Sequence, residues 1–467
     1  MKVDFSKLER AFNPRCVVVV GDKGVSNFMW LRGQSNFKGK LYSVQLDPNE
    51  IPGIEELGVK NFTSLLDIPE PVDLVIVAVP RPIAPRILAD CIKKDAAAAH
   101  FFTSGFAETG TEEGIGLQQT LTRMAEEANF HLIGPNCMGI YSPAVGIRQT
   151  PMQRTGFDGT VGFIAQSGTH AIAFSEEAYQ QGVEINKSVS FGNGVVLDST
   201  DYLAYFGNDD GIEAIGMYLE GVRDGRRFVR TLKEVVTRKP VVVWKGGRTE
   251  EGHRAISSHT GSMAVPMAIW DTAIKQSGAV TVRSMEELVD ALKAIQYLKP
   301  VYGNRVGITG GSGGQSVAIA DVFAEAGLKV PALTQESYDE LASFFTLIGG
   351  GYRNPIDTGN VNRLQMKRIM GILENDDNVD NLVLLTSVNS RMAEQLDRDI
   401  TMLAETRQRT QKPVAAILAY QSPEAMQTAS EVARKFRDGG IPTFTSLERG
   451  AKALKNALEY YILKRRD

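Results

Sequence analysis

The chain alternates between short apolar runs and longer amphipathic stretches. The first run, CVVVV at 16–20, is β-branched almost throughout, as expected for a strand buried on both faces of a parallel sheet. Similar runs follow at 40–46, 73–79, 97–102 and 131–134. Stretches with helical spacing at about 83–94 and 112–129 separate the later runs. The pattern predicts a doubly wound, Rossmann-like α/β domain over residues 1–147.

Two further series of apolar runs follow this domain. The second begins at TVGFIAQSG (160–168) and closes with a helix at 284–299, which predicts a domain over 148–300. The third begins at RVGITGGSGG (305–314) and ends in a basic helix at about 446–466, which predicts a domain over 301–467. The remaining strand candidates lie at 184–192, 212–221, 239–247, 380–388, 412–420 and 441–444. The fold class is therefore α/β, with three parallel-sheet domains in succession.

The second and third series open alike. VGFIAQSG (161–168) and VGITGGSG (306–313) align without gaps at an offset of 306 − 161 = 145 residues. Val, Gly, Ser and Gly occupy the same four places, and each copy predicts a strand, a Ser-Gly turn and a helix. The match indicates either two related domains or a chance similarity between two parallel-sheet openings, and the sequence leaves both open.

Composition and charge exclude several classes of protein. Apolar residues make up 43% of the chain, and Lys+Arg 51 against Asp+Glu 55 gives a net charge of −4. This balance argues against a nucleic-acid or anionic-membrane surface. No apolar run approaches the roughly 18 residues that a membrane span needs, and MKVDFSKLER lacks the apolar core of a secretory signal. Cys16, Cys91 and Cys137 have no CxxC spacing, so we expect no disulfide framework and a reducing cytoplasm.

Small residues form a turn after the opening strand of the second and of the third series. Such a turn leaves backbone N–H groups uncovered at a helix N-terminus, where the helix dipole attracts an anion. A single turn of this kind more often reflects tight packing of a helix on a strand, whereas two turns in separate domains suggest one anion held between two helix ends. The turns comprise Ser167, Gly168 and Thr169 in one case and Gly310, Gly311, Ser312, Gly313 and Gly314 in the other.

A polar segment with two histidines follows the apolar run VVVW (241–244). GGRTEEGHRAISSHTGSMA (246–264) predicts a long loop at the carboxyl end of a strand, where α/β proteins bind ligands. It contains His253 and His259, and imidazole is a good nucleophile toward phosphoryl groups near neutral pH. Glu220, in YLEG, is placed to accept the Nδ1 proton of a histidine and fix its tautomer. Taken singly, a loop histidine or a strand-end glutamate is more often only solvated.

The first domain has loops suited to a nucleotide. GDKGVSN (21–27) follows its first strand, and later strand ends lead into VP (79–80), TSGF (103–106) and GPNCMG (134–139). The match to GxGxxG is poor, because Gly21 and Gly24 are its only glycines. Asp47 follows the second strand at a spacing that suits a ribose, so these residues alone leave NAD open.

Taken together, the motifs resemble the NDP-forming acyl-CoA synthetases. This family includes ADP-forming acetate–CoA ligase and, more distantly, succinyl-CoA synthetase, and the resemblance extends from about residue 14 to 460. The motifs that carry it are, in order, GPNCMGI, AQSGT, SFGNGVVLDSTDYLAYF, YLEG, KPVVVWKGGRTEEG and SSHTGS.

The resemblance implies a phosphohistidine mechanism. The histidine that is phosphorylated corresponds to His259, and the glutamate that supports it corresponds to Glu220. The first Ser-Gly turn would hold the phosphate through Ser167, Gly168 and Thr169. The second turn, with Gly311, Ser312, Gly313 and Gly314, would offer another helix end. The resemblance also implies that the domains at 148–300 and 301–467 are flavodoxin-like.

The resemblance further implies the substrates and partners. CoA would bind the first domain in place of NAD. An acid–CoA ligase interconverts a small carboxylic acid, CoA and ATP with acyl-CoA, ADP and phosphate through an acyl phosphate. No segment resembles the ATP-grasp module, so ATP, ADP and Mg²⁺ are expected on a separate β-type subunit, in an α₂β₂ assembly. The residues expected to bind CoA are Gly21, Asp22, Lys23, Val79, Pro80, Ser104, Gly105 and Asn136.

The sequence departs from the family pattern in three places, and these favour an acid bulkier than acetate, or an aromatic one. They are the first turn (Phe28, Met29 and Trp30), the residues after SHTGS (Met263, Ala264 and Val265) and His170 after QSG.

Two other functions compete with the ligase. One is a non-catalytic regulatory protein that binds CoA or acyl-CoA, against which the set of Glu220, His259 and Ser167 weighs. The other is an NAD-dependent oxidoreductase, which leaves the histidine segment and the third domain unexplained.

Overall fold

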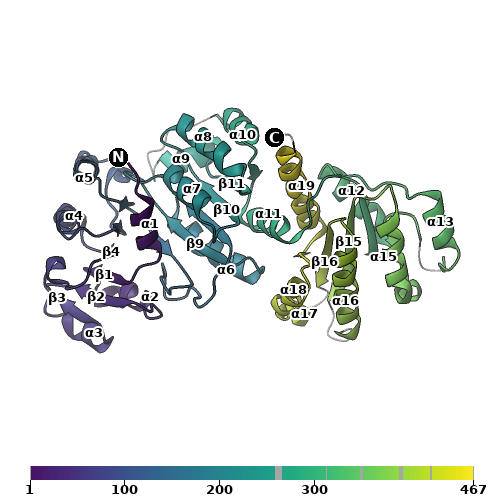
Figure 1. Cartoon of the computed structure of the whole chain (residues 1–467), viewed down its shortest axis with the longest axis horizontal. Coiled ribbons are helices and arrows are strands. Elements are labelled where there is room, and N and C mark those ends of the chain that lie inside the picture. Colours follow the sequence, from purple (N-terminus) through teal and green to yellow (C-terminus); the bar gives the residue numbers. More distant parts are fainter. Residues whose placement is uncertain are drawn as a thin grey trace. The chain divides into compact units, whose positions relative to one another are not determined.

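The computed structural model describes residues 2–257, 266–311, 313–347, 351–388, 393–420 and 423–465. Two predicted site residues, His259 and Ser312, lie outside the described residues, as do Met263, Ala264 and Val265. The described residues form three β-sheets with flanking helices (Figure 1). The chain divides into two compact units, one of Met1–Tyr179 with Glu184–Arg283 and the other of Gln180–Val183 with Ser284–Asp467.

The first sheet has the strand order β3-β2-β1-β4-β5-β6, and every neighbouring pair is parallel. This order, 3-2-1-4-5-6, is that of a Rossmann fold and confirms the predicted topology. The strands are β1 (Cys16–Val20), β2 (Lys40–Val44), β3 (Lys60–Phe62), β4 (Leu74–Val77), β5 (Ala98–Phe101) and β6 (Leu132–Ile133). The helices are α1 (Phe5–Phe12), α2 (Met29–Gly33), α3 (Ile51–Glu56), α4 (Ala84–Lys93) and α5 (Glu112–Glu127).

The second sheet has the order β12-β11-β10-β8-β9-β7, and only β7 runs antiparallel to its neighbour among these described strands. Its strands are β7 (Gly139–Tyr141), β8 (Val161–Ala165), β9 (Ile185–Ser190), β10 (Ala214–Leu219), β11 (Val241–Lys245) and β12 (Val280–Val282). Its helices are α6 (Gly168–Gln180), α7 (Ser199–Asn208), α8 (Gly225–Val236), α9 (Glu250–Ser257) and α10 (Met267–Gln276).

The third sheet has the order β14-β13-β15-β16-β17 and lies in the second unit. Its strands are β13 (Val306–Gly311), β14 (Ile356–Asp357), β15 (Asn381–Val388), β16 (Val414–Tyr420) and β17 (Thr443–Phe444). The larger helices of this unit are α11 (Met285–Tyr297), α12 (Ser316–Glu325), α13 (Gln335–Ala342), α15 (Met366–Asn375), α16 (Ala393–Arg409), α18 (Ala429–Asp438) and α19 (Leu447–Lys464). The shorter ones are η5 (Gly313–Gln315), α14 (Gly359–Asn362), η6 (Arg363–Gln365) and α17 (Pro423–Gln427).

The parallel strands of the second and third sheets share one topology. Counted from β8 and from β13 respectively, both have the order 2-1-3-4-5, which is the flavodoxin-like order. The repeated motif supplies the same element in each, the first strand and the turn that leads to the first helix. This correspondence favours related domains over a chance similarity between the two openings.

The first and second sheets are held in one unit by a continuous apolar core. Val17 and Ile76 from the first sheet belong to the same buried cluster as Ile164 and Met217 from the second. Helix α1 packs between them, with the Phe12 ring centred 5.3 Å from that of Tyr205. The carboxyl ends of both sheets are therefore fixed relative to each other within this unit.

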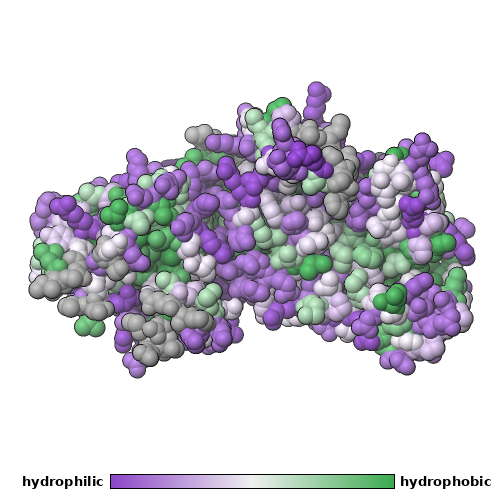
Figure 2. Space-filling model, turned by 180° about the vertical axis from the view of Figure 1, so that it is seen from behind, coloured by the Kyte–Doolittle hydropathy of each residue, from purple (hydrophilic) through white to green (hydrophobic). Residues whose placement is uncertain are grey.

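Hydrophilic residues cover much of the face seen in Figure 2. Among the described helices, none combines the length and the apolar character needed to cross a membrane.

Candidate functional site

The carboxyl ends of β8, β10 and β11 are cross-linked by polar side chains. The Gln166 side-chain oxygen accepts hydrogen bonds from the backbone N–H of Glu220 at 2.9 Å and of Gly221 at 3.2 Å. The Lys245 ammonium donates to the Glu220 carbonyl oxygen at 2.8 Å. Because three neighbouring strand ends share these bonds, the backbone that carries the Glu220 carboxylate is held in a defined place.

The predicted phosphate turn starts directly after Gln166. Gly168 begins α6, and Ser167 Oγ accepts a hydrogen bond from the His170 N–H at 3.4 Å. A Cβ on Gly168 would lie 2.5 Å from Met138 Cγ, so glycine suits the place where α6 passes close to the residue before β7. Thr169 is exposed. Gln166 therefore links the start of α6 to Glu220, as the prediction of one shared site requires.

A buried cation lies beneath Glu220. Lys245 is 1% exposed, and its ammonium bonds to the carbonyl oxygens of Glu220 and Gly246. Burial lowers the pKa of Lys245, and the nearby Glu220 carboxylate opposes this shift. Lys245 and Gln166 could not be singled out from the sequence, because the Glu220 backbone that both contact lies 25 and 54 residues away, respectively.

An aromatic cluster adjoins the Glu220 carboxylate through Tyr218. The Tyr218 hydroxyl lies 3.4 Å from Glu220 Oε1, to which it donates. The His170 ring stacks on Tyr218 with centroids 4.1 Å apart and meets Trp244 edge-on at 4.9 Å. Burial lowers the pKa of His170, so this imidazole is uncharged at neutral pH. His170, which was predicted to lie near the phosphate turn, therefore adds an apolar face to this edge rather than a positive charge.

The structure corrects the prediction of one continuous loop over 246–264. Residues Glu250–Ser257 form α9, and the Thr249 hydroxyl accepts a hydrogen bond from the Gly252 N–H at 3.1 Å. This cap, with two glutamates in the first turn, favours a helix where composition alone predicted a loop. His253 lies in α9, and its backbone N–H donates to the Thr249 carbonyl at 2.8 Å. His259 lies outside the described residues.

The second predicted turn lies at the carboxyl end of β13. Gly310 has φ +96°, and a Cβ there would lie 2.1 Å from the Leu385 carbonyl oxygen. Only glycine accommodates both constraints. Gly313 and Gly314 start η5, which leads into α12. Gly310 and Gly311 line a cavity of about 580 Å³, to which the ends of β15, β16 and β17 also contribute. This cavity, like the turn, belongs to the second unit.

A cavity of about 380 Å³ opens at the carboxyl edge of the first sheet. Six of the eight residues predicted to bind CoA line it, namely Gly21, Asp22, Lys23, Val79, Pro80 and Ser104. Gly105 and Asn136 are not among its lining residues. The Gly105 carbonyl accepts from Arg81 at 2.7 Å, and the Asn136 amide donates to Asn193 at 3.3 Å.

Gly21 and Asp22 shape the turn that borders this cavity. Gly21 has φ +83°, and a Cβ there would lie 2.6 Å from Val79 Cγ1. The Asp22 carboxylate accepts hydrogen bonds from the N–H groups of Lys23 at 3.0 Å and Leu31 at 2.9 Å. Burial raises the pKa of Asp22. The contacts of Asp22 thus serve the turn and the start of α2, while its predicted contact with CoA stays a prediction.

The bulky residues of the first turn form part of the cavity wall. Met29 and Trp30 line the cavity, and the Trp30 ring packs against His100 at 5.1 Å and Phe102 at 5.2 Å. His100 is buried, and neither of its ring nitrogens has a hydrogen-bond partner among the described residues. Burial lowers the pKa of His100 to about 3. A site built this way offers one apolar wall and, at Lys23 and Arg81, two cationic side chains.

The three cysteines are buried and none forms a disulfide. Burial raises the pKa of Cys137 to about 12, which agrees with the packing role predicted for it. Within residues that the structure describes, no group of three or more His, Cys, Asp and Glu side chains is placed to hold a metal ion.

Comparison with protein families assigns two segments. Residues 17–143 match the CoA binding domain, and residues 158–295 match the succinyl-CoA ligase like flavodoxin domain. The first match covers the strands of the first sheet, and the second covers the parallel strands of the second sheet, β8 to β12. Both therefore agree with the Rossmann-like and flavodoxin-like strand orders.

Several proteins are similar to this chain over nearly its whole length. Acetate–CoA ligase (ADP-forming) I of Archaeoglobus fulgidus is 34% identical over 96% of this chain, which spans 63% of that protein. Acetate–CoA ligase (ADP-forming) II subunit alpha of Pyrococcus furiosus is 32% identical, with 96% of each chain covered. A solved structure is also similar, that of a dinucleotide-forming acetyl-coenzyme A synthetase 1 from Ca. Korarchaeum cryptofilum in complex with phosphate and ADP. It superposes with a TM-score of 0.83 at 29% identity, and the match covers 98% of this chain and 97% of that chain.

Proposed function

Because the chain belongs to the ADP-forming acetyl-CoA synthetase family and is similar to its alpha subunits, we propose that it is the alpha-type subunit of an acid–CoA ligase. The proposed reaction interconverts a carboxylic acid, CoA and ATP with acyl-CoA, ADP and phosphate. The proposed domains are a CoA-binding domain at 1–147 and two ligase domains at 148–300 and 301–467.

One observation carries the proposal: Glu220 and the Ser167 turn share a polar network at one sheet edge, joined by Gln166. The segment that contains His259 leaves this same edge, because it follows β11 and Lys245. His259 would accept the phosphoryl group on Nε2 while the Glu220 carboxylate holds the Nδ1 proton. The N–H groups at the start of α6 would stabilise the phosphoryl charge.

In the direction of synthesis, ATP would phosphorylate His259, and two transfers follow. First, a carboxylate oxygen of the acid attacks the phosphorus and the P–N bond to His259 breaks, which yields an acyl phosphate and the free imidazole. Second, the CoA thiolate attacks the acyl carbonyl and the C–O bond to phosphate breaks, which releases acyl-CoA and inorganic phosphate. Splitting the condensation in this way replaces one difficult step with two easier ones.

CoA would enter through the cavity of the first sheet. Lys23 and Arg81 line this cavity and would attract an anionic ligand, although Arg81 also pairs with Glu113. Gly21 approaches Val79 so closely that a side chain at 21 would intrude on the turn. The turn at 310–314, with Gly311, Ser312, Gly313 and Gly314, would offer a second helix end to the phosphohistidine. Each of the two turns follows the first strand of a sheet with the order 2-1-3-4-5, and this shared position supports the role.

ATP, ADP and Mg²⁺ would bind a separate ATP-grasp subunit of β type, in an α₂β₂ assembly. Two relatives from Pyrococcus furiosus that this chain matches over 96% of their length are themselves subunits alpha, which supports a division of the enzyme between two chains. We propose a cytoplasmic enzyme, from its reduced cysteines.

The acid would be larger than acetate. The stacked rings of His170 and Tyr218, with Trp244 edge-on, place aromatic surface next to Glu220. An aromatic or branched acid would gain contact area there that acetate lacks. Rates with acetate, a branched acid and an aromatic acid test this, and a clear preference for acetate would refute it.

The reverse half-reaction tests the proposal with this chain alone. Acyl-CoA and labelled inorganic phosphate would give an acyl phosphate, and then a labelled histidine that is stable in base and labile in acid. His259→Asn should abolish the label, while His253→Ala should retain it. Label that persists in His259→Asn would contradict the mechanism. Binding of acyl-CoA with no labelling of the wild type, with or without an ATP-grasp partner, would favour the regulatory alternative.

A further inference from the structure

A half-buried arginine, Arg363, links four segments near the second glycine turn. Arg363 starts η6, and its Nη2 donates to Thr386 Oγ1 and to Asp399 Oδ2, both at 2.9 Å. Its Nη1 donates to the Gly310 carbonyl at 3.4 Å. The guanidinium therefore connects the end of β13, the end of β15 and helix α16.

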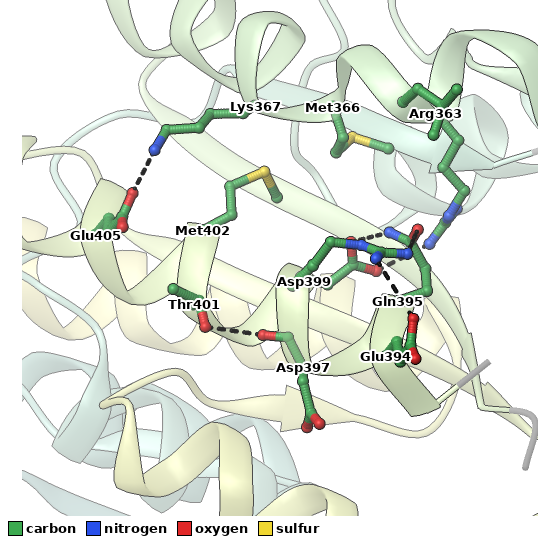
Figure 3. Close-up of a pocket in the computed structure, with 12 residues that line it drawn as sticks. Arg363, Met366, Lys367, Glu394, Gln395, Asp397, Asp399, Thr401, Met402 and Glu405 are labelled. Atoms are coloured by element: carbon green, nitrogen blue, oxygen red, sulfur yellow. Dashed lines mark hydrogen bonds and ion pairs between the residues drawn. The ribbon is translucent and has the colours of Figure 1, made fainter.

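The carboxylate that orients this arginine is itself fully engaged. Asp399 is 1% exposed, and it accepts hydrogen bonds from Thr386 Oγ1 at 2.8 Å and from the Gln395 amide at 2.8 Å. Figure 3 shows Arg363, Gln395 and Asp399 converging at one end of the pocket, with Lys367 and Glu405 paired at the other. Because both Asp399 oxygens accept hydrogen bonds, the Arg363–Asp399 ion pair is held in one geometry. Such a fixed pair suits a residue that positions its neighbours better than one that binds a ligand.

Gly310 is the point at which this network acts on the backbone. The peptide between Gly310 and Gly311 is flanked by two glycines, and Gly310 has φ +96°. Such a peptide rotates more easily than one flanked by residues with side chains. Because the carbonyl and N–H of a trans peptide point in opposite directions, a donor on the Gly310 oxygen also fixes where the Gly311 N–H points. It thereby sets the direction in which the chain leaves β13 for the turn.

We propose that Arg363 is a positioning residue, which presets the start of the glycine turn, at Gly310 and Gly311, for phosphoryl transfer by holding the Gly310 carbonyl. The inference rests on the proposed function, in which this turn offers a helix end to the phosphohistidine. Arg363 touches no reacting atom, and acts only through the backbone of the turn.

The surroundings of Arg363 allow a chemical test. The residue lines both the cavity of about 580 Å³ beside the turn and an outer groove of about 770 Å³ between α15 and α16. Truncation to alanine would therefore leave a space that solutes reach from the groove. Guanidinium ion has the shape and donors of the lost group, and would occupy that space beside Asp399.

Arg363→Ala should lower kcat of acyl-CoA formation about 10- to 100-fold, because small misplacements of a catalytic group have effects of this size. The KM for CoA should change less than about threefold, because CoA is assigned to the other unit. Guanidinium chloride at tens of millimolar should restore kcat at least about threefold, and Arg363→Lys should restore less than the wild-type rate, since lysine lacks the planar fork. Arg368→Ala, which replaces an exposed arginine on helix α15 directly after η6, should match the wild type with and without guanidinium.

Hydrogen exchange gives a readout that needs no partner and no turnover. In full-length Arg363→Ala, peptides that cover 306–320 should exchange faster than in the wild type, and peptides that cover 161–175 around the other turn should not change. An unchanged kcat, a loss of kcat that guanidinium does not restore, or unchanged exchange at 306–320 would each overturn the inference. An inactive wild type would contradict the proposed function instead, and the exchange experiment would still decide the role of Arg363.

Discussion

Replacing Gln166 with leucine tests whether this side chain holds the candidate site together. The leucine has a similar volume but no acceptor, so the N–H groups of Glu220 and Gly221 lose the oxygen that they share at 2.9 and 3.2 Å. A fully buried N–H without a partner costs about 1–3 kcal/mol. Both residues are half-buried, so water replaces part of this loss. We expect the free energy of unfolding of the first unit to fall by about 1–3 kcal/mol in total.

The effect on activity should exceed the effect on stability. Without Gln166 the Glu220 backbone loses one of its restraints, although Lys245 still holds its carbonyl. The carboxylate can then shift, so the rate of histidine labelling should fall about 10- to 100-fold. Labelling is measured with acyl-CoA and labelled phosphate, and unfolding with urea. Gln166→Glu keeps an acceptor oxygen and should remain within about threefold of the wild-type rate. Gln119→Leu, at an exposed position of α5 in the same unit, is the matched control. A Gln166→Leu variant that labels at the wild-type rate would refute this reasoning.

Three further predictions concern the first sheet. The pKa of His100 is about 3 in the folded protein against about 6.5 when unfolded, so only the unfolded state takes up this proton as the pH falls from 6.5. The free energy of unfolding should therefore be unaffected by His100 above pH 6.5 and should fall by about 2 kcal/mol by pH 5.0. In urea titrations His100→Leu should lose correspondingly less stability over this range. Equal losses in both proteins would contradict the pKa assigned to His100. Gly21→Ala would place a Cβ 2.6 Å from Val79 Cγ1 at φ +83°, which strains the turn. The affinity for CoA, measured by calorimetry, should fall at least about tenfold, and an unchanged affinity would show that the turn is not part of the CoA site. Burial raises the pKa of Cys16 to about 11 and of Cys137 to about 12, so neither thiol should react with iodoacetamide at pH 8 until urea unfolds the chain, and rapid labelling of native protein would disprove their burial.

The strands that the sequence predicts well are those buried on both faces. CVVVV at 16–20 coincides with β1, and the apolar runs at 73–79, 239–247 and 412–420 contain β4, β11 and β16. Four strands escaped prediction, namely β3, β7, β12 and β14, and each lies at the edge of its sheet. An edge strand has a neighbour on one side only and is two or three residues long here, so it needs no continuous apolar run.

The sequence and the family resemblance pointed to the strand-end residues of the candidate site, but not to the side chains that join them. The Ser167 and Gly310 turns show in the sequence because a tight turn between strand and helix requires small residues at adjacent positions. The polar groups that orient the site were missed, because Gln166 meets Glu220 across 54 residues and Arg363 meets Asp399 across 36. Nothing in the composition around 166 or 363 distinguishes these residues from solvated ones.

The sequence by itself therefore determined the succession of strands and helices, the glycine turns and the family to which they point, since each depends on residues that are neighbours in the chain. The tertiary structure decided which side chains meet, because strand order and register bring the ends of β8, β10 and β11 together in one unit and those of β13 and β15 in the other. A one-residue slip in register moves every side chain of a strand to the opposite face. Register is therefore set by packing of the whole sheet and cannot be deduced from any single segment.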